Sequence, residues 1–173
     1  GAWILRQACG QLRRWQDQFP HTQELTMNVN CSAKQLSQPD LLMQIDQIIE
    51  ETGIDPTCLK LEITESMLME NALQSTELLE QLRTRKIELC IDDFGTGQSS
   101  LSYLKHLPVN KLKIDRSFIM DIPNDSNDMA ITKAILALSS SLGLSTLAEG
   151  VENVEQEKFL IQQGCSKVQG FYY

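Results

Sequence analysis

Two adjacent carboxylates, Asp92 and Asp93, are the residues of this sequence best suited to chemistry. They end the apolar run Leu89-Cys90-Ile91, and the loop Phe94-Gly95-Thr96-Gly97 follows them. Adjacent anions repel one another and resist burial unless they share a cation, so the pair is typical of a site for hard metal ions. A capped turn is the alternative, because two aspartates before a glycine are also ordinary turn chemistry.

A strand that ends in a polar residue recurs along the chain. Short β-branched or leucine-rich runs, each followed by a helical pattern, predict six strands, at residues 25–30, 59–64, 87–92, 111–115, 144–149 and 166–170. Apolar residues at helical spacing predict helices between them, including residues 41–51, 73–83, 129–142 and 155–163. The alternation of strand and helix predicts an α/β fold with a parallel sheet, of the (β/α)8 TIM-like barrel type.

Strand phase sorts the side chains between the two faces of this predicted sheet. Leu59, Leu61 and Ile63 share one face, while Lys60 and Glu62 share the other. If the apolar faces pack against helices, one polar residue near the end of each strand points into the barrel lumen. These residues are Asn30, Glu62, Asp92, Lys113, Glu149 and Gln169. Barrel enzymes keep their active sites at that end, although any one of these side chains could instead be solvated or salt-bridged.

Composition favours oxygen ligands and argues against several classes of partner. The formal net charge of -8 and the absence of a polybasic run argue against binding to nucleic-acid polymers or anionic membranes. The five cysteines are dispersed without a CxxC pair, and the two histidines lack a paired-ligand spacing, so zinc is not expected. Carboxylate and amide oxygens fit Mg²⁺ or Mn²⁺ best. No apolar run is long enough to suggest a membrane span or a signal peptide, and we expect a cytoplasmic segment.

The length predicts a single domain over residues 1–173 that holds only part of a barrel. A closed eight-stranded βα barrel takes about 250 residues, and six strands cannot close it. We therefore expect this chain of 173 residues to be a piece of a longer protein, with strand edges that other segments cover.

Six motifs, taken together and in this order, resemble one known family, the EAL domains, which are bacterial phosphodiesterases of the second messenger cyclic di-GMP. The motifs are Asn28-Val29-Asn30-Cys31-Ser32, Leu61-Glu62-Ile63-Thr64-Glu65-Ser66, Asp92-Asp93-Phe94-Gly95-Thr96-Gly97-Gln98-Ser99-Ser100, Lys111-Leu112-Lys113-Ile114-Asp115-Arg116-Ser117-Phe118, Ala148-Glu149-Gly150-Val151-Glu152 and Gln169-Gly170-Phe171. A protein kinase is excluded, because no glycine-rich phosphate loop or catalytic-loop signature accompanies Asp-Phe-Gly.

The resemblance implies two divalent cations and hydrolysis of cyclic di-GMP to linear pGpG. It makes Asn30, Glu62, Asp92 and Glu149 ligands of a first cation and assigns Asp93 to the second. Lys113 takes an electrostatic role, and Glu149 serves as a ligand or as an acceptor of a proton. By the same resemblance Glu65 steadies the loop after Asp93. Glu152 and Gln169 meet the substrate or position water.

The family resemblance also has a gap. The Glu-Ala-Leu strand that names the family is absent from this sequence, and with it one metal-ligand glutamate, so we expect the chain alone to be inactive and the intact parent to be the enzyme. The alternative is a catalytically inactive domain that binds cyclic di-GMP, or a partner protein, as a receptor. By analogy with the family we expect sensor or cyclase-like domains in the parent chain and a homodimer through the loop of Asp92.

Overall fold

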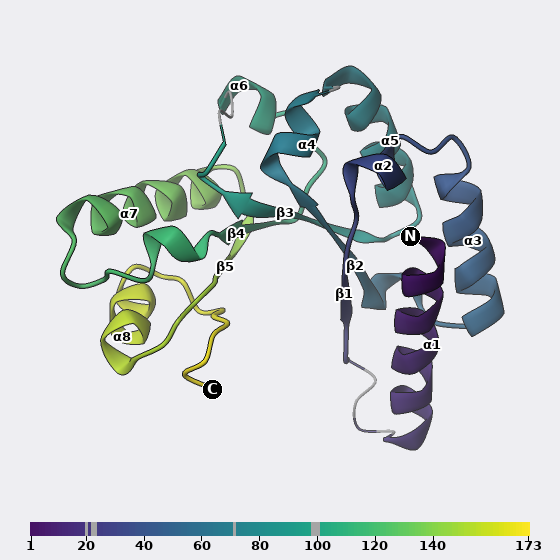
Figure 1. Cartoon of the computed structure of the whole chain (residues 1–173), viewed down its shortest axis with the longest axis horizontal. Coiled ribbons are helices and arrows are strands. Elements are labelled where there is room, and N and C mark those ends of the chain that lie inside the picture. The colour runs from purple at the N-terminus through teal and green to yellow at the C-terminus, as the bar shows by residue number, and fades with distance from the viewer. Residues whose placement is uncertain (20, 22–23, 71, 98–100) are drawn as a thin grey trace. The chain divides into compact units, whose positions relative to one another are not determined.

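Five strands lie within the residues that this computed structural model describes, which are 1–19, 21, 24–70, 72–97 and 101–173. Their order in the sheet follows the sequence: β1 (Met27–Asn30), β2 (Leu59–Thr64), β3 (Glu88–Phe94), β4 (Lys111–Ile114) and β5 (Ser145–Ala148) (Figure 1). The pairs β1–β2, β3–β4 and β4–β5 are parallel. The predicted α/β fold class is confirmed, and with five strands the barrel is incomplete in this chain.

Helices connect the strands, as the alternating pattern predicts. The α-helices are α1 (Ala2–Gln18), α2 (Ala33–Leu36), α3 (Leu41–Thr52), α4 (Glu65–Glu70), α5 (Ala72–Thr84), α6 (Leu101–Leu104), α7 (Ser126–Ser141) and α8 (Val154–Gln162). Two 3-10 helices, η2 (Pro56–Cys58) and η3 (Arg116–Phe118), precede β2 and follow β4. Helix α7 begins three residues earlier than its apolar pattern predicts, because the Asp125 side chain accepts hydrogen bonds from the backbone N–H groups of Asn127 and Asp128.

The sixth predicted strand, at residues 166–170, is a single β-bridge between Val168 and Ala148. The backbone N–H of Ala148 donates to Lys167 O, and the N–H of Gln169 donates to Ala148 O. Gly170 then packs against the backbone of Val151 so closely that a β-carbon would collide with it. The prediction of a full strand there is wrong, although its pairing with the preceding strand is present.

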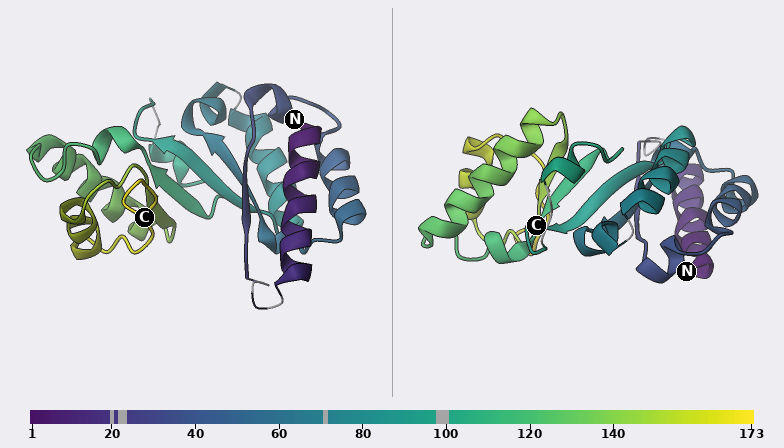
Figure 2. Two further views of the ribbon diagram at one scale, coloured as in Figure 1. Left: turned by 60° about the horizontal axis from the view of Figure 1, so that its bottom comes forward. Right: turned by 90° about the horizontal axis from the view of Figure 1, so that it is seen from above.

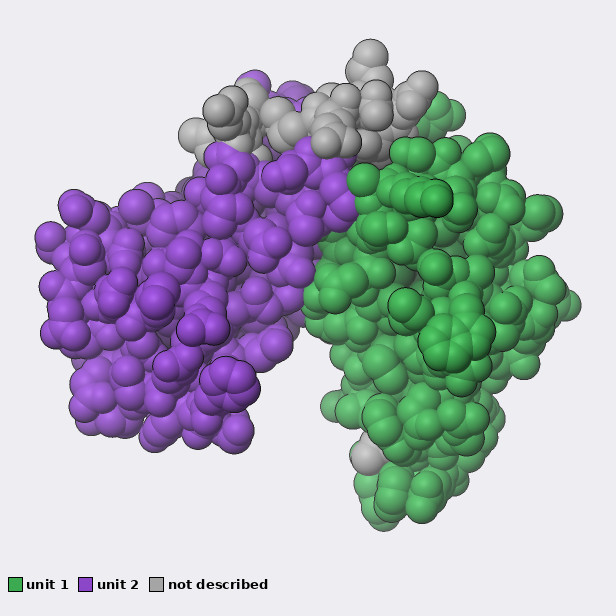
Figure 3. Space-filling model, in the orientation of Figure 1, with its two compact units in different colours: residues 1–63, 70–89 green, residues 64–69, 90–173 purple. Residues whose placement is uncertain are grey.

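The chain divides into two compact units (Figure 3). Unit 1 comprises residues 1–63 and 70–89, and its helices α1 and α3 lie side by side (Figures 1 and 2). Its buried apolar side chains include Leu5, Cys9 and Leu12 of α1, Ile45 and Ile48 of α3, and Leu59, Leu61 and Ile63 of β2. Each large side chain buried in this way contributes about 1.5–3 kcal/mol. The prediction of a single domain over residues 1–173 stays a prediction.

Unit 2 comprises residues 64–69 and 90–173, and helix α7 packs against β4 and β5. Leu112 and Ile114 of β4 are fully buried. The two lysines of this strand are buried as well, since Lys111 is only 5% exposed and Lys113 only 4%. Two buried ammonium groups in one short strand require anionic partners nearby. Strand β4 is therefore the element around which we expect the carboxylates of the site to gather.

All five cysteines are free and buried. Burial raises the pKa of the Cys9 and Cys31 thiols to about 11, so both stay protonated at neutral pH. None of the helices among the described residues combines the length and the apolar character needed to cross a membrane.

Candidate metal centre

A β-bulge brings Asp92 and Asp93 together at the carboxyl end of β3. Ile91 pairs with Leu112 and Phe94 pairs with Ile114, so three steps along β3 match two steps along β4. The two aspartates therefore share the place of one residue beside Lys113. Asp93 has a left-handed backbone, with φ of 54°, which aspartate tolerates better than most residues. Bulges of this kind re-aim side chains next to functional sites.

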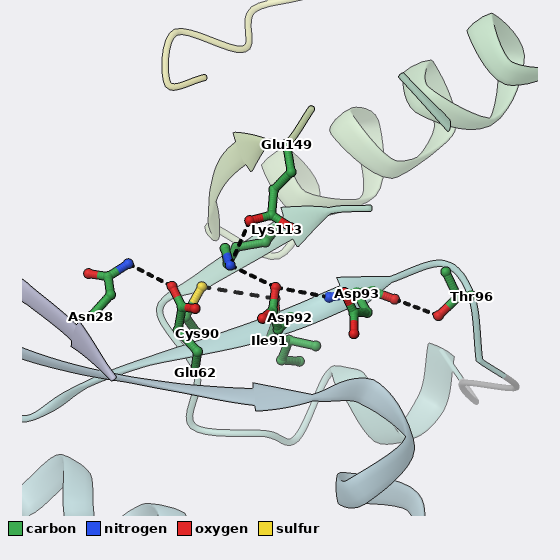
Figure 4. Close-up of polar contacts among 9 residues, drawn as sticks. All are labelled: Asn28, Glu62, Cys90, Ile91, Asp92, Asp93, Thr96, Lys113 and Glu149. Atoms are coloured by element: carbon green, nitrogen blue, oxygen red, sulfur yellow. Dashed lines mark hydrogen bonds and ion pairs between the residues drawn. The ribbon is translucent and has the colours of Figure 1, made fainter. Parts of the chain in front are cut away.

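Lys113 lies between two carboxylates (Figure 4). Its Nζ is 2.8 Å from Oδ1 of Asp92 and 2.7 Å from Oε1 of Glu149. Glu149 follows β5, and its backbone N–H donates to Ile114 O at 3.1 Å, which extends the pairing with β4 by one residue. The ammonium group thus balances part of the negative charge that gathers at the ends of three neighbouring strands.

Three carboxylates form a cluster that could hold a cation. Asp92, Asp93 and Glu149 each offer an oxygen, and these oxygens lie within 4.8 Å of one another. Burial raises the pKa of Asp93, and the charges of Asp92 and Asp115 raise it further, while Lys113 acts in the opposite direction. Since the local charge is more negative than one lysine can balance, the donor set fits a hard divalent cation.

The unit 1 residues predicted for the site lie on β1 and β2. Asn30 and Glu62 are register partners at the carboxyl ends of the two parallel strands. Glu62 is only 6% exposed, whereas the Asn30 side chain is exposed. A further residue, Asn28, donates a hydrogen bond from Nδ2 to Oε1 of Glu62 at 2.6 Å.

Glu65, the predicted support of the loop after Asp93, lies at the start of α4 and is 3% exposed. Its Oε2 accepts a hydrogen bond from the backbone N–H of Gly95 at 2.8 Å. A β-carbon on Gly97 would stand 2.6 Å from Oε1 of Glu65, so a larger residue there would require the Glu65 carboxylate to shift. Residues 98–100 of this loop lie outside the described residues.

Glu152 and Gln169 occupy exposed positions in unit 2. Oε1 of Glu152 is 3.6 Å from a guanidinium nitrogen of Arg116. The backbone of Gln169 pairs with its neighbours, since its carbonyl accepts from the N–H of Val151 at 3.0 Å. The segment that carries Glu149 is thus held by the chain around Gln169, while the Glu152 carboxylate belongs to an exposed ion pair.

Two further polar residues, one in each unit, have contacts that the motifs do not predict, although Asn28 belongs to the first motif. Gln156 of α8 is 1% exposed, and its Nε2 donates to the carbonyls of Ile119 and Met120, both at 3.1 Å. Its Oε1 accepts from the N–H groups of Glu152 at 2.7 Å and Asn153 at 3.2 Å, the second as part of a capping box. An Asn-x-x-Gln pair before an apolar run signals such a cap. The other residue, Asn28, shares the face of Asn30 by strand alternation.

The fold and the site together define an α/β-barrel type of protein with an acidic cluster at the carboxyl ends of its strands. The chain belongs to the EAL domain family, whose match extends over residues 1–173. This result confirms the resemblance that the six motifs indicate.

Individual relatives agree with this assignment. The chain is 44% identical over 171 residues to the cyclic di-GMP phosphodiesterase NbdA of Pseudomonas aeruginosa, which covers 99% of this chain and 22% of that protein. The solved complex of the phosphodiesterase PaMucR with c-di-GMP shares 44% identity and a TM-score of 0.94, over 99% of this chain and 69% of that one. The chain spans about a fifth of the length of the first curated relatives that it matches.

A more distant solved relative contains divalent metal ions. BlrP1 of Klebsiella pneumoniae, in a calcium and cy-diGMP complex, has a TM-score of 0.84 and 27% identity, over 97% of this chain and 43% of that one. A manganese and cy-diGMP complex of BlrP1 has a TM-score of 0.79 and 29% identity, over 86% of this chain and 38% of that one. Relatives of this fold are therefore known with divalent cations.

Proposed function

We propose that this chain is part of a phosphodiesterase domain that hydrolyses cyclic di-GMP to linear pGpG with divalent cations. The observation that carries the proposal is the buried ammonium of Lys113 between Asp92 and Glu149, at the end of the sheet where barrel enzymes act. The name of NbdA and the c-di-GMP complex of PaMucR support the choice of substrate.

We assign Asn30, Glu62, Asp92 and Glu149 to a first cation and Asp93 to a second. All these donors are carboxylate or amide oxygens, which suit Mg²⁺ or Mn²⁺. Two such cations, when bound, would lower the pKa of a water molecule and offset the negative charge on the oxygens of the phosphoryl group that it attacks. The calcium and manganese complexes of BlrP1 support a divalent cation.

The chain's own residues then have distinct tasks. Lys113 counters the negative charge that develops on the phosphoryl group, from a position already fixed by its two ion pairs. The water oxygen forms a bond to phosphorus, its proton passes to Glu149, and the bond from phosphorus to the 3′ oxygen breaks. The departing 3′ oxygen takes up a proton and remains as a hydroxyl of the linear product. No covalent intermediate with the protein is required.

The remaining predicted site residues hold the loop after Asp93 or contact the substrate. Glu65 fixes the loop after Asp93 through the N–H of Gly95, so Asp93 keeps its left-handed backbone. We assign Glu152 and Gln169, which lie at the same end of unit 2, to contacts with substrate or with the water molecules around it. Their exposure suits groups that act only when a ligand is present.

Product analysis tests the proposal. The protein in its natural full length is incubated with cyclic di-GMP and Mg²⁺ or Mn²⁺, beside a Glu62→Gln variant and a Glu77→Gln control, which changes an exposed glutamate of α5. Linear pGpG from the natural protein and the control, but not from Glu62→Gln, is the expected result. Tight binding of cyclic di-GMP without any product would instead establish a receptor.

The partners of the parent protein are part of the same proposal. The relative MucR is named a bifunctional diguanylate cyclase and cyclic di-GMP phosphodiesterase, which supports a cyclase-like or sensor domain beside this one. By analogy with the family we propose a homodimer through the loop of Asp92 and a cytoplasmic location, where the second messenger is found. Light scattering on the full-length protein, with and without cyclic di-GMP, tests the dimer, and a monomer in both states would contradict it.

A further inference from the structure

We propose that Asn28 is a positioning residue for Glu62 and that it sets the affinity of the site for Mg²⁺ or Mn²⁺. The inference rests on the proposed function, in which Glu62 is a ligand of the first cation. The observation behind it is the hydrogen bond from Nδ2 of Asn28 to Oε1 of Glu62, which at 2.6 Å is short for an amide donor (Figure 4).

The geometry follows from the pairing of β1 with β2. Asn28 is the register partner of Lys60, and Asn30 is the partner of Glu62. Alternation along β1 puts Asn28 and Asn30 on the same face, with the buried Val29 on the other. The amide of Asn28 therefore reaches diagonally along the ladder, two residues toward the carboxyl end of β2, and meets the carboxylate of Glu62.

The chemistry of the donor matters. Lys60, the register partner of Asn28, lies 2.6 Å from Glu88 in a partly buried ion pair. Asn28 instead presents a neutral donor to Glu62, and a neutral donor orients a carboxylate without cancelling the charge that attracts a cation. It holds Oε1 of Glu62, the residue that we assign to the first cation.

The loss in metal affinity on removal of a hydrogen bond to a metal ligand is known in general terms. Groups that orient metal ligands by hydrogen bonds change metal affinity by about 10–100-fold when they are removed. Glu62 is 6% exposed, so its rotamer is restricted, and the hydrogen bond from Asn28 helps to fix the rotation of its carboxylate. Asn28 itself is exposed, so its replacement leaves the core of unit 1 intact.

The test measures Mn²⁺ binding without substrate, by calorimetry or by electron paramagnetic resonance, on the full-length protein. Asn28→Ala removes the donor, and Asn28→Val removes it while favouring the strand conformation. The control is Asn124→Ala, at an exposed asparagine of unit 2. We expect Mn²⁺ dissociation constants about tenfold higher for both Asn28 variants, and no change for the control. Thermal melting of the metal-free proteins should not separate the Asn28 variants from the natural protein.

The outcomes distinguish this inference from the proposed function. Equal Mn²⁺ affinity in the natural protein and both Asn28 variants overturns the role of Asn28 and leaves the phosphodiesterase proposal standing. Loss of hydrolysis by the variants with unchanged Mn²⁺ affinity also overturns it, because Asn28 would then act on something other than the cation. A natural protein that binds no Mn²⁺ overturns both.

Discussion

The ammonium nitrogen of Lys113 lies 2.7 Å from Oε1 of Glu149, and the lysine side chain is 5% exposed. Within unit 2, this contact ties the middle of β4 to the first residue after β5, and the same nitrogen also pairs with Asp92. Taking away one partner of a buried pair leaves an uncompensated charge, so these three side chains depend on one another.

Replacement of Lys113 by methionine is expected to remove activity and, because it leaves Asp92 and Glu149 without their shared ammonium group, also to lower stability. Methionine fills a similar volume, but it cannot counter charge on the phosphoryl group, so we expect kcat for cyclic di-GMP hydrolysis to fall by about 100-fold or more. Chromatography of the product measures this rate. Lys111→Met removes the other buried lysine of β4, and we expect it to change stability with little effect on kcat. Equal rates for Lys113→Met and the natural protein would refute the electrostatic role.

Removal of the Glu65 carboxylate is expected to loosen the loop after Asp93. Glu65→Ala leaves the Gly95 N–H without its carboxylate acceptor, at a cost of about 1–3 kcal/mol if no water replaces it. We expect faster amide hydrogen exchange at residues 95–97 and a lower kcat. Glu65→Gln keeps an acceptor oxygen and should retain most of the protection. If the alanine variant exchanges no faster than the natural protein, Glu65 does not hold the loop.

The buried amide of Gln156 is expected to matter for stability. Gln156→Leu keeps the bulk of the side chain but removes its hydrogen bonds to two carbonyls and two N–H groups. Of these four groups, the Ile119 carbonyl keeps a hydrogen bond from the N–H of Ile122. We expect the free energy of unfolding in urea to fall by about 3 kcal/mol. Gln162→Leu, at an exposed position of the same helix, should change it by less than about 0.5 kcal/mol. A similarly small effect for Gln156→Leu would show that the hydrogen bonds of the Gln156 amide do not stabilise the fold.

A bidentate ion pair in unit 1 makes the free energy of unfolding depend on pH. Nε and Nη2 of Arg85 donate to the two carboxylate oxygens of Asp46 at 2.6 and 2.8 Å. These hydrogen bonds lower the pKa of Asp46 below its ordinary value. The stabilisation is therefore complete above the unfolded pKa, and it is lost as the pH falls through the folded pKa.

Asp46→Asn is accordingly expected to cost about 0.5 kcal/mol at neutral pH, since the pair is partly exposed. The difference from the natural protein should shrink steadily below about pH 4, where the unfolded carboxyl begins to take up its proton. Urea unfolding across this range measures it, with Glu50→Gln on the same helix as the control. A difference that stays constant with pH would show that the charge is not responsible.

The sequence predicts the elements of the fold well because their signals are local. Alternating strand and helix patterns locate all five strands, and β2 is found with the predicted bounds. The sixth fails because residues 166–170 contain one apolar residue, Val168, and because the approach of Gly170 to Val151 is a contact between distant segments. No periodicity in the sequence indicates the contact of Gly170 with Val151.

The candidate site is less predictable from the sequence than the elements of the fold are. Strand parity places Asp92 on the face of Lys113, but the same parity assigns Asp93 to the opposite face. The bulge between Ile91 and Phe94, which brings both aspartates to one place, depends on pairing with β4 and leaves no local trace beyond the glycines that follow. The hydrogen bonds of Asn28 and Gln156 likewise depend on neighbours that only the folded chain supplies.

The contact between Gly170 and the backbone of Val151 also limits how the domain can be changed. Backbone atoms cannot swing aside as a side chain can, so any larger residue at position 170 must push the Glu149 segment out of place. In a saturation library of the full-length protein, selected for function, glycine alone should survive at position 170. The exposed positions of α8, such as Ile161, should accept many residues. A position that tolerates only glycine would thus mark the contact with the Glu149 segment, even if the role of Glu149 in the reaction were not known.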